Sequence, residues 1–328
     1  MDLPVGFEDI VEAAKRIEGA AVATPLVESP LLNRIAGGRV LVKAEGLQRT
    51  GSFKFRGAFN RLSQLDDDAR RAGVVAYSTG NHAQGVAAAA ALLDIPAVIV
   101  MPADAPAIKL ENTKAYGAEI VLYDRARDNR EEMGARLAAE RSATLVPSYD
   151  DVRIIAGQGT VGLEIAAAAE AMGVKLDAVL IPCGGGGLSS GTAIALKTRC
   201  PGSEIFAVEP EGFDDWARSL KAGRRLANAP GAQSFCDALL APMPGELTFE
   251  INARLLSGAL AVADDAVATA MAAAFSHLKL VVEPAGAIAL AAVLSGQFDC
   301  HGRTVCVVCS GANVDAETFR RAIAVGSE

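Results

Sequence analysis

Lys54 is the residue of this 328-residue chain whose neighbours most suggest covalent chemistry. It lies in KAEGLQRTGSFKFRGA, between Phe53 and Gly57, where a loop is expected to lead into a helix. A lysine held in a partly apolar pocket can lose its proton, and the neutral amine can then form a Schiff base with an aldehyde. A lysine beside aromatic residues is more often a surface cation. The functional interpretation of Lys54 therefore depends on the segments that accompany it.

A run of four glycines, Gly184 to Gly187, is the second feature. It follows the apolar segment DAVLIPC and precedes Leu188 and SSGTAIALKT, which is typical of a helix. Glycine lets the main chain approach a ligand closely, and N–H groups at a helix start can surround an anion. This context predicts a phosphate site, with a permissive turn as the alternative. Neither a Lys-Ser/Thr pair nor a G-x-G-x-x-G spacing is present, which disfavours kinase and dehydrogenase functions.

Two polar clusters also follow apolar runs. STGNHAQG places Ser78, Thr79, Asn81 and His82 after VVAYS, and CSGANVD places Ser310 after TVCVV. The carboxyl ends of strands in open α/β sheets are where ligands bind, so these side chains are candidates for one site. For His82, a structural hydrogen bond is the alternative.

The segments between these clusters predict an α/β fold. Short β-branched runs such as VVAYST, AVIVMP and EIVLYD alternate with helical stretches such as NHAQGVAAAAALL and NREEMGARLAAE, which is the βαβ pattern. Residues 69–149 are expected to form a small substrate-side domain. Residues 1–68 and 150–328 are expected to form a larger cofactor-binding domain that combines both chain ends.

Charge and hydropathy exclude several classes of partner. The net charge of −8 disfavours nucleic-acid binding, and the acidic N-terminal segment is unlike a secretory signal. The longest apolar stretch, AQGVAAAAALLDIPAVIV, is interrupted by Asp94 and Pro96, so no membrane span is expected. We therefore expect a cytoplasmic protein.

The cysteines are expected to be reduced thiols in the core. Four of the six, Cys183, Cys236, Cys306 and Cys309, lie in apolar segments. Cys306 and Cys309 form a C-x-x-C pair, but in a strand this spacing points the two sulfurs to opposite faces. A metal shared by this pair is therefore not expected.

Taken together and in this order, the segments resemble the pyridoxal-phosphate enzymes of the tryptophan-synthase β-subunit fold. The resemblance is to the threonine/serine dehydratase and serine racemase branch, and it spans nearly the whole chain through TGSFKFRGA, STGNHAQGV, IIAGQGTVGLEI, IPCGGGGLSSG, VEPEGFDDW, VVEPAGA and CSGANVD. It implies two open twisted sheets flanked by helices, pyridoxal 5'-phosphate as cofactor and a homodimer.

The resemblance also implies roles for individual residues. Lys54 would carry the cofactor and remove the α-proton, and Thr79 stands where racemases of this branch present a serine that reprotonates the opposite face. Ala238 follows Cys236 and Asp237 where Ala-Asp-Gly is usual, so its methyl group would press on the ring face opposite Phe53. The implied cofactor-binding residues are Phe53, Lys54, Asn81, Gly184, Gly185, Gly186, Gly187, Leu188, Ala238, Glu283 and Ser310, and the implied substrate-binding residues are Ser78, Thr79, Asn81, His82 and Arg130.

The activity implied is elimination of water from L-threonine or L-serine to give a 2-oxo acid and ammonia. A 3-hydroxyaspartate dehydratase and a serine racemase are the alternatives on the same scaffold, and a non-catalytic phosphate-ligand binding protein is the alternative of another class. Arg130, in YDRARDNREEM, could engage the second carboxylate of a dicarboxylic substrate if it points into the pocket. An exposed helical arginine is the other interpretation, and the i, i+4 charge pairing of the segment favours it.

The resemblance further implies a divalent cation near the glycine run. Glu209, Asp215 and the carbonyl of Phe213 in VEPEGFDDW match its ligands, and oxygen ligands suit Mg²⁺, Mn²⁺ or Ca²⁺. A solvated acidic loop is the alternative. Because the chain ends at AETFRRAIAVGSE, about where the catalytic unit should end, no feedback control by isoleucine through an appended domain is expected.

Overall fold

A six-stranded sheet forms the core of the larger lobe. The computed structural model describes residues 3–78, 80–105, 107–124 and 127–325. The strand order is β1-β2-β10-β7-β8-β9, and every pair is parallel except β1 with β2. The strands are β1 (Leu26–Glu28), β2 (Arg39–Ala44), β7 (Ala178–Pro182), β8 (Glu204–Pro210), β9 (Gly258–Val262) and β10 (Thr304–Cys309).

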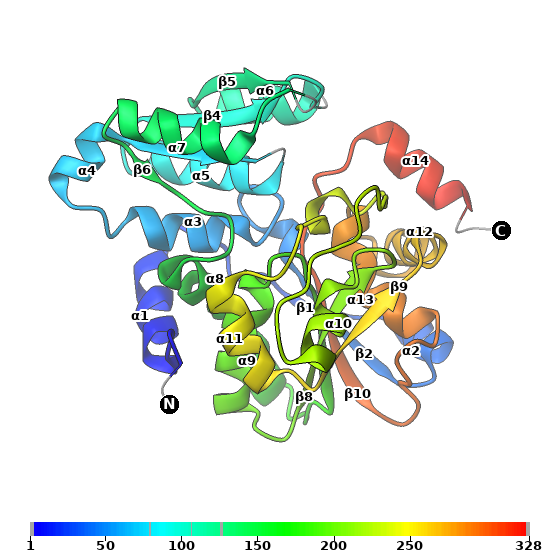
Figure 1. Cartoon of the computed structure of the whole chain (residues 1–328). Helices are drawn as coiled ribbons and strands as arrows, with labels where there is room; N and C mark the ends of the chain where they lie inside the picture. The colour runs from blue at the N-terminus through cyan, green and yellow to red at the C-terminus, as the bar shows by residue number, and fades with distance from the viewer. Residues whose placement is uncertain (1–2, 79, 106, 125–126, 326–328) are drawn as a thin grey trace.

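A four-stranded parallel sheet forms the core of the smaller lobe, which lies above the larger one in Figure 1. Its order is β5-β4-β3-β6. The strands are β3 (Val74–Tyr77), β4 (Ala97–Pro102), β5 (Glu119–Tyr123) and β6 (Thr144–Leu145). Two sheets flanked by helices confirm the predicted α/β fold class.

The helices connect these strands and cover both sheets. The α-helices are α1 (Phe7–Ile17), α2 (Pro30–Ala36), α3 (Lys54–Leu62), α4 (Asp67–Ala72), α5 (Asn81–Leu92), α6 (Ala107–Ala115), α7 (Arg130–Glu140), α8 (Val152–Ala171), α9 (Gly187–Arg199), α10 (Asp215–Ala222), α11 (Glu246–Leu255), α12 (Asp264–Ala273), α13 (Pro284–Leu294) and α14 (Ala316–Val325). Shorter turns of helix are η1 (Glu45–Leu47), η2 (Asp237–Leu239) and the π-type η3 (Ala274–Leu278).

The two faces of the larger sheet face different hydrophobic cores. Helices α2, α12 and α13 pack against one face, and α8 and α9 against the other. Side chains of β10 alternate between these cores, as strand geometry requires. Cys306 lies in the core under α8 and α9, whereas Cys309 lies in the core under α13, so the two sulfurs do face opposite sides. The cysteines that the structure describes are free thiols, and the four in apolar segments are buried, as predicted.

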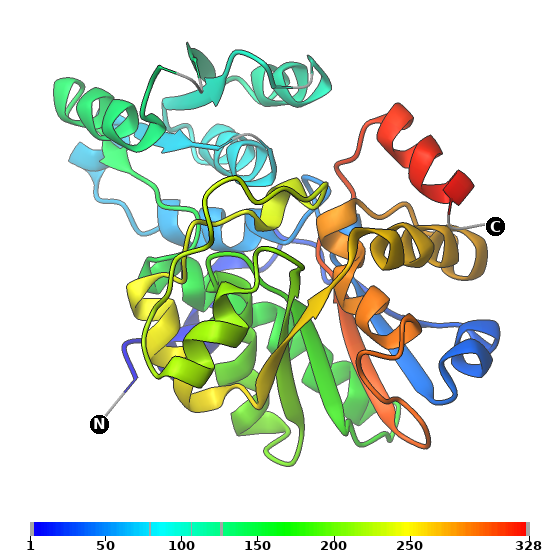
Figure 2. The ribbon, with the colours of Figure 1, turned by 45° about the vertical axis from the view of Figure 1, so that its right-hand side comes forward.

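Helix α3 lies where the two lobes meet. It packs on α5 of the smaller lobe and on α8 of the larger one, an arrangement visible in both ribbon views (Figures 1 and 2). Lys54 is its first residue, so the side chain projects from this junction. The strands of the smaller sheet fall between residues 74 and 145; the domain boundaries at 69 and 149 remain predictions.

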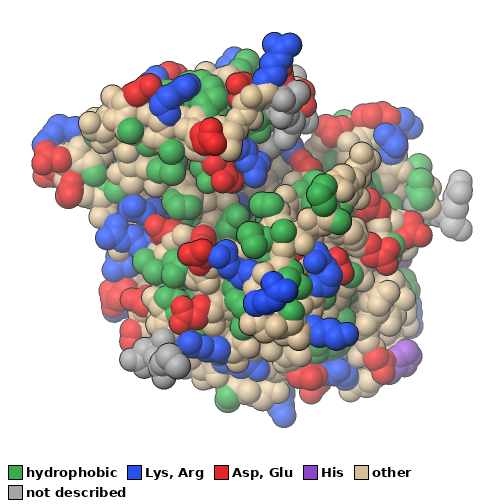
Figure 3. Space-filling view, viewed as in Figure 1, with side chains coloured by type: hydrophobic (Ala, Val, Ile, Leu, Met, Phe, Trp, Pro, Cys, Tyr) green, Lys and Arg blue, Asp and Glu red, His purple; other side chains and the backbone are tan. Residues whose placement is uncertain are grey.

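The surface carries charges of both signs. Lys and Arg side chains are interspersed with Asp and Glu on the face shown in Figure 3. Within the described ranges, no helix combines the length and apolar character that a bilayer crossing requires.

Candidate active site

A cavity of about 490 Å³ lies between the two lobes, at the carboxyl ends of strands from both sheets. Segments that follow β3, β7 and β10 contribute to its wall, as expected for open α/β sheets. Every described residue predicted to bind cofactor or substrate lines it: Phe53, Lys54, Ser78, Asn81, His82, Arg130, Gly184, Gly185, Gly186, Gly187, Leu188, Ala238, Glu283 and Ser310. Thr79 lies outside the described residues.

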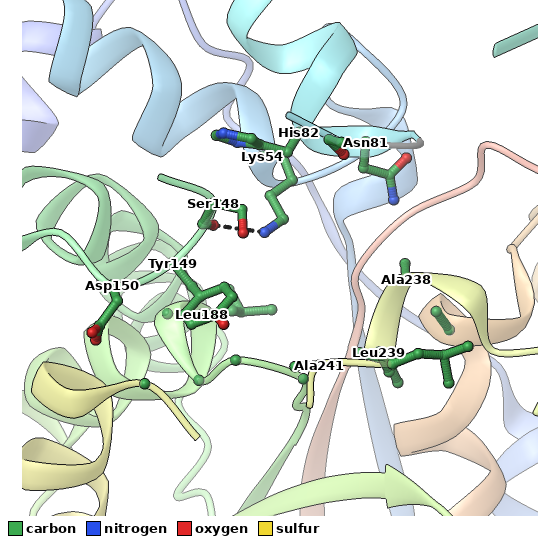
Figure 4. Close-up of a pocket in the computed structure, with 18 of the residues that line it drawn as sticks. Lys54, Asn81, His82, Ser148, Tyr149, Asp150, Leu188, Ala238, Leu239 and Ala241 are labelled. Atoms are coloured by element: carbon green, nitrogen blue, oxygen red, sulfur yellow. Dashed lines mark hydrogen bonds between the residues drawn. The ribbon is translucent and has the colours of Figure 1, made fainter. Parts of the chain in front are cut away.

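Lys54 points into this cavity with its amine held by the backbone. Its Nζ donates a 2.8 Å hydrogen bond to the carbonyl of Ser148 and lies 5.2 Å from the centroid of the Phe53 ring (Figure 4). Among the described residues, no carboxylate pairs with it. Burial lowers the pKa of Lys54 to about 8, because a charged ammonium loses its hydration there. A sizeable neutral fraction at physiological pH is what a nucleophilic amine needs.

The loop that carries Lys54 is joined to the end of β10. The N–H of Phe53 donates to the carbonyl of Ser310 at 3.2 Å, and Ser52 forms a β-bridge with Gly311. Ser310 is buried and lines the cavity. This contact brings two segments more than 250 residues apart in the sequence to the same wall.

The glycine loop, here called the glycine cradle, is packed so closely against its neighbours that side chains would not fit. Gly186 has φ of +96°, and a Cβ on Gly185 would lie 2.3 Å from the ring of Tyr149. Helix α9 begins at Gly187, so its first-turn N–H groups are directed at this end of the cavity. Leu188 and Tyr149 lie beside the loop, opposite Ala238 and Leu239 (Figure 4). A glycine loop that leads directly into a helix suits a phosphate group, because the backbone N–H groups at the helix start can donate to the phosphate oxygens.

Asn81, the first residue of α5, is fixed by two side chains from the larger lobe. Its Nδ2 donates to Glu283 Oε1 at 2.6 Å, and its Oδ1 accepts from Asn313 Nδ2 at 2.8 Å. Burial raises the pKa of Glu283 to about 8, so this carboxyl is largely protonated at neutral pH. The Asn81 amide is thus held in one orientation at the cavity wall.

His82 makes the structural hydrogen bond that was the alternative to substrate binding. Its Nε2 lies 3.0 Å from the carbonyl of Val146, which can only accept, so Nε2 carries the proton. Burial, and then the Lys54 charge, lower the pKa of His82 to about 3. The ring is therefore neutral, and its Nδ1 cannot donate to a carboxylate. The nearby Ser78 hydroxyl accepts from the N–H of Gly80.

Arg130 is half-buried at the cavity wall rather than on an exposed helix face. Asn129 caps α7 by accepting from the N–H groups of Glu131 and Glu132, which places Arg130 in the first turn. Its guanidinium lies 6.0 Å from the centroid of the Tyr77 ring. In the part of the chain that is described, it has no carboxylate partner.

Two residues of the predicted cation site are buried carboxylates outside the cavity. Glu209 accepts from the N–H groups of Trp216 and Ala217, whereas Oδ2 of Asp215 is buried without a hydrogen-bond partner. Burial raises the pKa of both groups. Trp216 connects them to the glycine loop, since its Nε1 donates to the carbonyl of Gly184 at 2.6 Å. Within the described residues, no group of three His, Cys, Asp or Glu side chains gathers as a metal site.

Several cavity residues were missed from the sequence, among them Ser148, Tyr149 and Lys109. Ser148 acts through its carbonyl, which no side-chain pattern reveals. Tyr149 packs its ring on the glycine loop, and burial raises the pKa of its hydroxyl to about 12. Lys109 comes from α6, whose sequence AIKLENTKA is typical of a solvent-exposed helix.

The fold and the site together define a two-lobed α/β enzyme in which a desolvated lysine and a phosphate cradle face one cavity. The family model described as pyridoxal-phosphate dependent enzyme matches residues 17–311. The chain belongs to this family, and the predicted tryptophan-synthase β-like fold is confirmed by its structural neighbours.

Relatives with three different activities are similar to this chain over most of its length. An L-threo-3-hydroxyaspartate ammonia-lyase of Pseudomonas sp. is 43% identical and covers 95% of this chain and 97% of the relative. An L-threonine ammonia-lyase of Thermotoga maritima is 38% identical over 98% of this chain and 79% of the relative. The structure of maize serine racemase superposes with a TM-score of 0.91 at 38% identity, covering 98% and 97% of the two chains.

The residues present fit pyridoxal phosphate. Four consecutive glycines leave the main chain of this loop free of side chains at the cavity wall, and the amine of Lys54 faces the same cavity. Phe53, Asn81 and Ser310 supply one aromatic ring and two polar groups between these points.

Proposed function

We propose that this chain is an ammonia-lyase that eliminates water from a small 3-hydroxy amino acid and releases a 2-oxo acid and ammonia. The observation that carries the proposal is the juxtaposition of a desolvated lysine with the glycine cradle in one cavity. Relatives named as ammonia-lyases, 43% and 38% identical, support the reaction class. A non-catalytic binding protein would have no need of an amine at this pKa.

The roles of the cofactor-site residues follow from their positions. When bound, pyridoxal phosphate supplies an electron sink for negative charge at the substrate α-carbon. N–H groups from Gly184 to Leu188 would hold the phosphate, and Phe53 would pack against the ring. The Ser310 hydroxyl would face the ring nitrogen, where it would be a weaker proton source than a carboxylate.

The proton transfers are assigned to Lys54. Its neutral Nζ takes the proton from the substrate α-carbon, and the hydrogen bond to the Ser148 carbonyl orients the amine beforehand. Burial keeps the amine uncharged often enough to act as a base.

Among hydroxy amino acids, we propose 3-hydroxyaspartate as the best substrate, ahead of L-threonine and L-serine. Arg130 is a half-buried cation in the cavity wall with no carboxylate partner among the described residues. Guanidinium groups bind carboxylates in bidentate fashion, so Arg130 suits the second carboxylate of a dicarboxylic substrate. The 43% identity to an L-threo-3-hydroxyaspartate ammonia-lyase supports this choice.

The test is a substrate panel with the reconstituted enzyme. Ammonia release is measured from L-serine, L-threonine and the 3-hydroxyaspartate diastereomers, with chiral analysis of residual serine to detect racemisation. Lys54→Ala should abolish all activity. Arg130→Met should lower kcat/KM for 3-hydroxyaspartate at least about tenfold, since a charge-assisted bond is lost, and leave serine nearly unchanged. Equal effects on both substrates would refute the role of Arg130, and no ammonia from any substrate would refute the reaction.

A divalent cation at Glu209, Asp215 and the Phe213 carbonyl is part of the proposal. Its support is the unpartnered Oδ2 of buried Asp215, for which a hard cation is a suitable partner. Added Mg²⁺, Mn²⁺ or Ca²⁺ should raise the melting temperature of the wild type and not that of Asp215→Asn. An equal response of both proteins would show that the cation binds elsewhere. The expected homodimer is also a proposal, which sedimentation analysis would test.

A further inference from the structure

Three buried side chains hold the glycine cradle from the side that faces the interior of the larger lobe. Each donates one hydrogen bond to a carbonyl of the cradle: Trp216 Nε1 to Gly184 at 2.6 Å, Thr248 Oγ1 to Gly185 at 2.7 Å, and Ser189 Oγ to Gly186 at 2.9 Å. The donors come from α10, α11 and α9, and all three are fully buried. They are not among the described residues that line the cavity.

The positions of these carbonyls determine where the N–H groups of the cradle point. A trans peptide unit is planar, and its N–H points opposite to its C=O. The N–H groups of Gly185, Gly186 and Gly187 share peptide units with the three held carbonyls, so they point to the cavity side. Within the described residues, none of these three N–H groups has a hydrogen-bond acceptor. Three unused donors on one side of a loop form a site for an anion.

The hydrogen bond from Ser189 to the cradle has a fixed direction. Its hydroxyl has one proton, which goes to the Gly186 carbonyl because a carbonyl can only accept. The two lone pairs accept from Asn252 Nδ2 at 2.9 Å and from the Cys183 thiol at 3.2 Å. Burial raises the pKa of the Cys183 thiol, so the thiol keeps its proton and can donate. The hydroxyl is therefore held in the orientation that donates to Gly186.

The polar character of this region is costly for the fold. Asn252 is fully buried, and its Oδ1 has no hydrogen-bond partner among the described residues. An apolar side chain of similar shape would pack at this position without an unpaired amide oxygen. A polar network at such a place is better explained by the orientation of the cradle than by stability.

We propose that Trp216, Thr248 and Ser189 are positioning residues for the cofactor phosphate. Asn252 supports Ser189 in this role. The three donors hold the carbonyls away from the cavity, so the N–H groups are aimed at the phosphate before the cofactor binds, and binding does not have to turn any peptide unit. This inference rests on the proposed function, because that function assigns the phosphate to residues 184–188.

A purely structural role of the three donors makes a different prediction. If they only pack their helices against the cradle, changing them should weaken the binding of any ligand that uses the cavity. If they orient the N–H groups, the loss should be confined to ligands that carry a phosphate. Pyridoxal keeps the ring and the aldehyde of the cofactor but lacks the phosphate. The ratio of the Kd values for the two ligands therefore separates the two roles.

The experiment measures the Kd of pyridoxal phosphate and of pyridoxal with the full-length, cofactor-free protein. Quenching of Trp216, the single tryptophan of the chain, reports binding because its ring contacts the cradle. Thr248→Val removes one hydroxyl and keeps the side-chain shape, and Ser189→Ala removes the other hydroxyl. Each should raise the Kd of pyridoxal phosphate about three- to tenfold, and the double variant should raise it more than about tenfold. The Kd of pyridoxal should change less than about twofold.

Two matched variants serve as controls. Thr248→Ser keeps the hydroxyl and loses a methyl group, so it should bind both ligands like the wild type. Ser190→Ala removes a buried hydroxyl that donates to the carbonyl of Thr248 and not to the cradle, so it should change neither Kd. Should Thr248→Val fail to fold, Ser189→Ala compared with Ser190→Ala decides the question alone.

Two results would overturn the inference: losses of equal size for both ligands, or no loss for either ligand in the double variant. A wild type that binds pyridoxal phosphate no tighter than pyridoxal would show that the cradle is not the phosphate site, and the cofactor roles in the proposed function would fail with the inference. A protein that gives the expected Kd values but releases no ammonia from any hydroxy amino acid would contradict the proposed function alone.

Discussion

The acidity of Lys54 gives the sharpest test of the site, because it can be measured without any substrate. Burial lowers the pKa of this amine to about 8, against 10.5 for an ordinary lysine. At pH 7 roughly one Lys54 amine in ten is then neutral, compared with about one in three thousand for an ordinary lysine. At pH 7, Lys54 should therefore react with a small acylating reagent about 300-fold faster than an equally accessible lysine whose pKa is 10.5, because its neutral fraction is larger by that factor.

The assay is pulse labelling of the cofactor-free protein with acetic anhydride between pH 6 and 11. Mass spectrometry of peptides compares Lys54 with exposed Lys114 at each pH. The labelling rate of Lys54 should rise to a plateau with a midpoint near pH 8. A midpoint near 10.5 would show that the ammonium is well hydrated, and the argument from burial would then be wrong.

The same shift has a consequence for stability. An amine whose pKa is about 8 when folded and 10.5 when unfolded destabilises the fold by about 3 kcal/mol below pH 8. From pH 8 to 10.5 the unfolded chain binds more protons, so the penalty disappears as the pH rises through this window. Lys54→Met should therefore stabilise the cofactor-free protein at pH 7 and lose that advantage by pH 10.5, as measured by urea unfolding.

Three further changes test other parts of the site. Arg56→Met leaves the buried carboxylate of Glu45 without its guanidinium and should cost roughly 3–5 kcal/mol in urea unfolding; a change under 1 kcal/mol would contradict this. Gly185→Ala puts a Cβ 2.3 Å from the Tyr149 ring, so the Kd for pyridoxal phosphate should rise at least about tenfold in an absorbance titration. The pKa of Glu283 is raised to about 8, so the wild type should lose stability relative to Glu283→Gln from pH 4.5 through 8; equal melting curves at pH 5 and 9 would refute this.

Local patterns were enough to predict the βαβ units. Strand β4 is the β-branched run AVIVMP, and α5 contains five consecutive alanines, so the two element types differ in composition over a few residues. The order of strands in the larger sheet could not be obtained in this way. Strand β10 lies between β2 and β7, and these pairings join residues far apart in the chain. No local period carries information about which distant strand becomes a neighbour.

The site shows the same division between local and distant information. The glycine loop could be predicted because four consecutive glycines at a helix start carry their own signal, and Lys54 could be predicted only from the segments that accompany it. Lys109 could not, since its partner Asp237 is 128 residues away and its own helix looks like a solvated one. The hydrogen bond of His82 to the Val146 carbonyl was equally hidden, because a backbone acceptor has no side-chain signature.

The buried ion network around Arg56 explains how one lysine can be held still at a junction of two lobes. Arg56 follows Lys54 by two residues in the first turn of α3, and its guanidinium bonds Glu45 of η1 and Glu164 of α8. Lys43 of β2 also pairs with Glu164. These contacts tie the first turn of α3 to η1 and to α8. Lys54, two residues before Arg56, is thereby anchored at the junction of the two lobes, where it lines the same cavity as the glycine loop.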